Sequence, residues 1–117
     1  MSIFKNYFEE NEVVERTLLI QENLAEGLQI AKDKYKKNIT ELVQAAIDEL
    51  IKTKSINLFT REIESSRGVP RTYRIKKKSY LKLEELKREN NNISIYTLVN
   101  IAVRNALISE GIIKEGK

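Results

Sequence analysis

Two short segments of the chain carry side chains that can form hydrogen bonds with the edges of DNA bases. They lie at residues 16–21, RTLLIQ, and 71–76, RTYRIK, and the first is short and rich in apolar and β-branched residues, as expected of a strand. In an extended strand, successive side chains point to opposite faces. One face therefore collects Thr17, Leu19 and Gln21 from the first segment and Thr72, Arg74 and Lys76 from the second. Arginine and lysine donate to guanine, glutamine pairs with adenine, and threonine contacts either base.

A lone strand leaves backbone N–H and C=O groups unpaired at both of its edges. We therefore expect the two segments to pair as one antiparallel ribbon. The other face of this ribbon would then lie against helices through Leu18, Ile20, Tyr73 and Ile75. A two-stranded ribbon fits the major groove of B-DNA, so the six outward residues are predicted to contact bases.

The helical segments that follow the two strands repeat each other. Residues 38–47 are NITELVQAAI and residues 94–103 are SIYTLVNIAV, with their apolar positions aligned at a spacing of 56 (95 − 39). Each copy opens on a residue that favours helix N-caps, Asn38 or Ser94, and Glu41 completes a capping box in the first copy. A weakly amphipathic helix precedes each copy, so the order strand, helix, helix occurs twice.

This pattern predicts a mainly α fold with a two-stranded antiparallel β-ribbon, in which two tandem repeats form an intramolecular pseudo-dimer. We expect an N-terminal arm at 1–14, the first repeat at 15–52, a linker at 53–69, the second repeat at 70–109 and a C-terminal tail at 110–117. A single repeat of roughly 40 residues is at the size where a domain needs a partner, a metal or a disulfide to fold. The other repeat is the expected stabiliser.

Composition excludes several other classes of protein. The chain has no cysteine and no histidine, which removes disulfides and Cys/His zinc sites, and no metal site or cofactor is predicted. Without those residues and without a glycine-rich phosphate loop, no catalytic residues and no enzyme activity are expected. No apolar run approaches the ~18 residues of a membrane span, and the N-terminus lacks a signal pattern. We therefore expect a cytoplasmic protein, in the host cytoplasm if it is viral, with no membrane partner and no evident small-molecule ligand.

The strand patterns and the two helix segments at 38–47 and 94–103 together resemble the ribbon-helix-helix family of the MetJ and Arc repressors. The resemblance covers roughly residues 15–52 and 70–109. Family members dimerise to form the ribbon, whereas this chain looks like a tandem form, similar to TraY-type plasmid proteins and to regulators of archaeal viruses. The resemblance implies base contacts from the outward strand residues. It also implies that the start of each second helix binds phosphate through free N–H groups. Those positions are Asn38, Ile39, Thr40, Ser94, Ile95 and Tyr96.

The predicted function is a sequence-specific transcriptional regulator, of the repressor type, that binds double-stranded DNA and could self-associate along it. The net charge of +4 suits a polyanionic partner. The first strand places Leu19 at its central outward position and carries no cation on that face, so the second strand should dominate recognition. Three alternatives stay open. They are a plasmid relaxosome or partition accessory protein, an antitoxin-type interaction module, and a solvated basic edge at 71–78 that only discourages aggregation.

Overall fold

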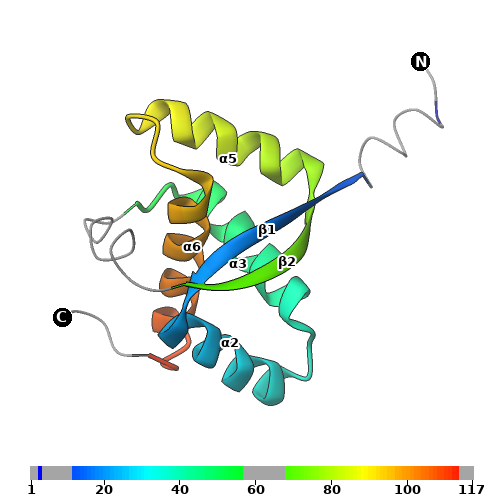
Figure 1. Ribbon diagram of the computed structural model, residues 1–117, viewed down its shortest axis with the longest axis vertical. Coiled ribbons are helices and arrows are strands. Elements are labelled where there is room, and N and C mark those ends of the chain that lie inside the picture. The colour runs from blue at the N-terminus through cyan, green and yellow to red at the C-terminus, as the bar shows by residue number, and fades with distance from the viewer. Residues whose placement is uncertain (1–2, 4–11, 57–67, 114–117) are drawn as a thin grey trace.

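The computed structural model describes residue 3 and residues 12–56 and 68–113. In these ranges the chain forms two strands and four helices, with the order strand, helix, helix occurring twice (Figure 1). The elements are β1 (Val13–Gln21), α2 (Glu22–Tyr35), α3 (Ile39–Thr53), β2 (Gly68–Lys76), α5 (Lys77–Glu89) and α6 (Ile95–Ser109). Most of the predicted N-terminal arm (1–2 and 4–11), most of the linker (57–67) and the end of the tail (114–117) lie outside the described residues.

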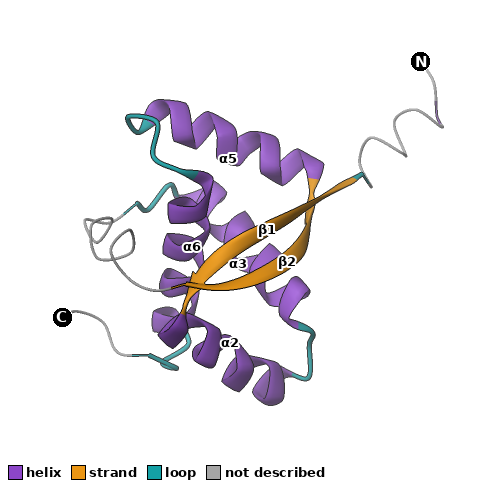
Figure 2. Cartoon of the chain, viewed as in Figure 1, coloured by secondary structure: helices purple, strands orange, loops and turns teal. Residues whose placement is uncertain are grey.

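The two strands pair antiparallel as one two-stranded sheet, which confirms the predicted ribbon (Figure 2). Their register centres on Thr17, which lies opposite Thr72. Both strands begin three residues earlier than the sequence indicates, at Val13 and Gly68. The sequence did not indicate these starts, because Arg16 and Arg71 are exposed residues at positions in phase with the buried side chains of their strands.

The ribbon covers α3 and α6, which pack against each other, while α2 and α5 lie on opposite sides of it (Figure 1). The four predicted inward residues of the ribbon are at most 8 % exposed, and the core that they join is continuous with all four helices. These residues are Leu18, Ile20, Tyr73 and Ile75. Burial of this apolar surface is the main term that holds the ribbon on the helices.

The second helices of the two halves start at the predicted caps but differ in burial. The Asn38 side chain accepts a hydrogen bond from the Glu41 backbone N–H at 2.8 Å, and Ser94 accepts one from Thr97 at 3.1 Å. Along α3 only one stripe of side chains is buried. In α6 every residue from Thr97 to Arg104 is buried, so α6 is the central helix of the fold. None of the helices in the described ranges has the length and apolar character needed to cross a bilayer.

The last residue of each strand donates its backbone N–H to a side chain from the other half of the chain. The Gln44 Oε1 atom on α3 accepts the backbone N–H of Lys76 at 2.9 Å, where β2 ends. The Asn100 Oδ1 atom on α6 accepts the backbone N–H of Gln21 at 2.9 Å, where β1 ends. Gln44 and Asn100 are the two positions that the internal repeat aligns (100 − 44 = 56). The sequence repeat thus corresponds to a reciprocal pair of contacts.

Candidate nucleic-acid interface

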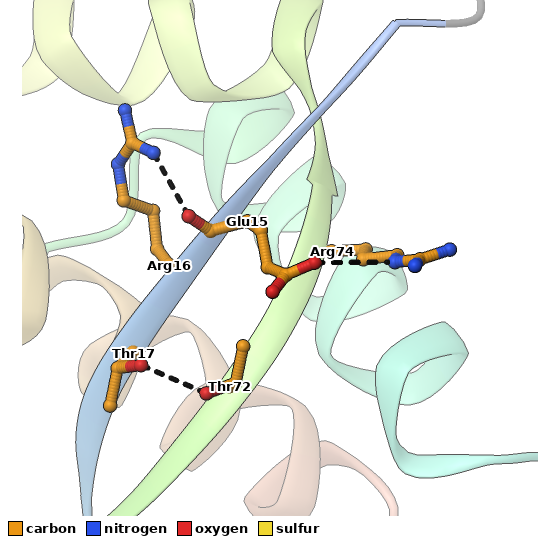
Figure 3. Close-up of polar contacts among 5 residues, drawn as sticks. All are labelled: Glu15, Arg16, Thr17, Thr72 and Arg74. Carbon is orange, nitrogen blue, oxygen red and sulfur yellow. Dashed lines mark hydrogen bonds and ion pairs between the residues drawn. The ribbon is translucent and has the colours of Figure 1, made fainter.

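The outward face of the ribbon consists of four cross-strand pairs of exposed residues. The pairs are Val13 with Lys76, Glu15 with Arg74, Thr17 with Thr72, and Leu19 with Pro70. Five of the six residues predicted for this face therefore lie on it, exposed to solvent. At its centre, the hydroxyl oxygens of Thr17 and Thr72 are 2.8 Å apart and share a hydrogen bond (Figure 3).

Gln21 is the exception, and its predicted place on the exposed face is wrong. The residue is only 5 % exposed. It is the last residue of β1, α2 begins directly after it, and its backbone N–H is bound to the fully buried Asn100 of α6. The equivalent residue at the end of β2, Lys76, remains exposed although Gln44 binds its backbone in the same way.

Glu15 is a member of this face that the sequence reasoning missed. It lies opposite Arg74, with its Oε2 atom 3.6 Å from the arginine Nε atom, and the two side chains are 62 % and 72 % exposed (Figure 3). A second ion pair, between Glu12 and Lys77 at 3.0 Å, lies at the same end of the ribbon. Extending the strand pattern back to Val13 would have revealed Glu15. At this exposure, the attraction within either pair is weakened by solvent.

Arg16 and Arg71 are two further cations at the ribbon that sequence reasoning left out of the site. Each directly precedes the central threonine of its strand, and each donates from Nη1 to the carbonyl of the preceding residue, at 2.9 and 3.0 Å. The guanidinium of Arg16 also lies 5.0 Å from the centre of the Tyr80 ring. Both residues are exposed, so the ribbon has one arginine on each strand next to its centre. A guanidinium presents several N–H donors, so two exposed arginines can bind an anionic group such as phosphate.

The predicted phosphate positions lie at the N-termini of α3 and α6. Asn38 is exposed, and the other five residues are partly buried: Ile39, Thr40, Ser94, Ile95 and Tyr96. In α3, the Glu41 carboxylate accepts a hydrogen bond from the Asn38 amide at 2.8 Å, which adds negative charge to the first turn. The first turn of α6 contains no acidic residue. The first turn of α6 therefore lacks the carboxylate that opposes an anion at the first turn of α3, because helix N-termini attract negative charge and Glu41 repels it.

A shallow depression lies in front of the α3 N-terminus. Its lining combines three lysines with Asn38 and one acid, as follows: Lys32, Asp33, Lys36, Lys37 and Asn38. These three lysines carry more formal charge than Glu41 and Asp33 together, so this end of the molecule is basic. Within the described ranges, no group of three or more carboxylates is placed to hold a metal ion.

The site as a whole is an exposed, mostly polar ribbon face, with a further exposed arginine on each strand next to its central threonine. Its side chains offer hydrogen-bond donors from Arg74 and Lys76, hydroxyls from the threonine pair and a carboxylate from Glu15. No protein-family model, curated protein or solved structure matches the chain. Any chemical role for the site therefore rests on the residues of the ribbon face and their geometry.

Proposed function

We propose that the chain is a sequence-specific double-stranded DNA-binding transcriptional regulator of the ribbon-helix-helix type. It inserts the β1–β2 ribbon into the major groove with the outward face toward the bases. The observation that carries this proposal is the exposed row of Thr17, Thr72, Arg74 and Lys76 on a ribbon whose other face is buried against helices. The major groove, about 12 Å wide, admits a two-stranded ribbon, and these side chains match its donors and acceptors.

The proposal includes an intramolecular pseudo-dimer formed by the two halves. Three observations support it: the order of elements occurs twice, the register centres on two equivalent threonines, and Gln44 and Asn100 make reciprocal contacts. In such an arrangement one chain forms a complete DNA-binding unit, which a homodimeric relative needs two chains to form. Further copies could then bind side by side along DNA.

Phosphate contacts would position this unit on the duplex. Arg16 and Arg71 flank the centre of the ribbon, and the N-terminus of α6 provides backbone N–H groups without a competing acid. Neutralising phosphates releases counterions, so affinity should fall steeply as salt concentration rises. The contacts of the outward ribbon face would supply the sequence preference.

Selection from a random-sequence duplex library, followed by footprinting, tests the proposal. Recovery of one short duplex site, protected in the footprint and bound less tightly as salt is raised, is the expected result. Absence of any duplex preference at every salt concentration tested would overturn it.

The strongest single contribution from the ribbon should come from Arg74. Reversing its charge with Arg74→Glu puts a second carboxylate next to Glu15 and removes a donor to guanine, so we expect a loss of affinity of at least about tenfold. Leu19→Ala removes only apolar contact at an exposed position and should cost a few-fold at most. Titration of both variants against the selected duplex at one salt concentration measures the difference. Equal losses would contradict the dominance of the second strand.

A further inference from the structure

Glu15 is an unexpected residue on a surface that should face DNA. Among the described residues of the ribbon, it carries the one carboxylate on the outward face. Because its side chain is 62 % exposed, packing does not explain its presence there. A carboxylate directed at a polyanion lowers affinity by repulsion unless it meets a hydrogen-bond donor.

The pairing of Glu15 with Arg74 suggests which donor it meets. The two side chains lie opposite each other across the strands, and the arginine uses its Nε edge toward Glu15. Figure 3 shows the far end of the guanidinium directed away from the carboxylate. A donor group and an acceptor group thus stand side by side on the outward face.

In the major groove a G·C base pair presents the complementary arrangement. Guanine offers the acceptors O6 and N7, and cytosine offers its N4 amino donor beside them. Arginine donates to the guanine acceptors, and a carboxylate accepts from cytosine N4. We propose that Glu15 and Arg74 together recognise one G·C base pair, with Glu15 as the specificity-determining residue for cytosine. This inference rests on the proposed function and specifies the base pair recognised by the same surface.

The opposite end of the outward face has different chemistry. Glu15 lies two residues before Thr17, and Arg74 lies two residues after Thr72. On the other side of the centre, the equivalent positions are Pro70, two residues before Thr72, and Leu19, two residues after Thr17. Pro70 and Leu19 are paired with each other. These two side chains have no hydrogen-bonding groups, and leucine is suited to contact a thymine methyl. The G·C pair should therefore appear on one side of the centre of the binding site, and the protein should bind in one orientation.

Two matched variants test the role of Glu15. Glu15→Ala and Glu12→Ala each remove one negative charge and one partner of a cation, Arg74 or Lys77, at the same end of the ribbon. The Glu12 carboxylate lies on the residue before β1 and outside the four outward pairs. General electrostatic effects on DNA affinity should therefore be similar in both variants, whereas a base-specific effect belongs to Glu15 alone.

The experiment is random-sequence duplex selection on wild type and both variants at one salt concentration. We expect the wild-type site to contain one off-centre G·C pair, and Glu15→Ala to reduce the preference at that position by about tenfold or more. Glu12→Ala should keep the preference. Three results would overturn the inference while leaving the proposed function intact. They are an unreduced preference for the G·C pair in Glu15→Ala, an equal reduction in both variants, and a wild-type site without an off-centre G·C pair. Failure of the wild type to select any duplex would instead refute the proposed function, and this inference with it.

Discussion

Tyr73 lies where the buried face of the ribbon meets its basic residues. The residue is 4 % exposed, pairs across the ribbon with Arg16, and follows Arg71 by two positions. Burial raises the pKa of its phenol above the ordinary value of 10.0, and the positive charge of Arg71 opposes part of that rise. The folded protein therefore holds the Tyr73 proton to a higher pH than the unfolded chain does.

This difference predicts a loss of stability in alkaline solution. Below about pH 10 the phenol is protonated in both states, and its contribution to the free energy of unfolding is constant. As the pH rises from there through the folded pKa, the unfolded chain ionises first, so the free energy of unfolding decreases. We expect urea denaturation followed across this range to show a steeper decline for the wild type than for Tyr73→Phe. Lysine ionisation affects both proteins, so parallel pH profiles would contradict the role of Tyr73.

At the scale of elements, alternation and the internal repeat were enough to predict the paired ribbon, its buried face and the helix caps at Asn38 and Ser94. The starts of the strands were not predictable from alternation, because the exposed residues Arg16 and Arg71 stand where the alternation would place buried apolar side chains. That error excluded Glu15 from the candidate site. Gln21 is held through its backbone N–H by Asn100, which is 79 residues away in the sequence, so no local pattern could indicate this contact.

The Asn100 side chain connects α6 to the end of β1 and supports a prediction about stability. Its amide accepts the N–H of Gln21 and donates to the carbonyls of Leu19 and Tyr96, at 2.9, 2.8 and 2.8 Å. Asn100→Ala would remove this partner from the buried N–H of Gln21 and from the partly buried carbonyl of Leu19. Removing the partner of a buried polar group costs roughly 1–3 kcal/mol. Urea denaturation monitored by circular dichroism measures this cost.

The matched control for that variant is Asn105→Ala on the same helix. The Asn105 amide donates to the carbonyl of Ser55 at 2.9 Å, in an exposed contact that water can replace. Its loss should cost clearly less than the loss of Asn100. Similar costs for the two variants would mean that Asn100 does not hold the strand end in the way that its contacts indicate.

At the scale of the whole molecule, the core belongs to both halves of the chain. Leu18 and Ile20 from the first strand and Tyr73 and Ile75 from the second bury against a single cluster, and α3 packs directly on α6. The ribbon itself needs one strand from each half. The burial of α6 along its whole middle section also depends on its neighbours in the first half. Neither half should therefore retain a closed core when the other is removed.

Separating the halves should therefore abolish folding, and recombining them should restore it. Residues 1–56 and 57–117, expressed separately, would each expose apolar helix faces and an unpaired strand, and chains of this size are only marginally stable. We expect neither fragment to show a cooperative unfolding transition as a monomer. An equimolar mixture should recover helical circular dichroism and elute as a 1:1 complex. A fragment that unfolds cooperatively as a monomer would show that its half is an independent domain. Folding only on mixing would show that the two halves stabilise each other, as the proposed single-chain DNA-binding unit requires.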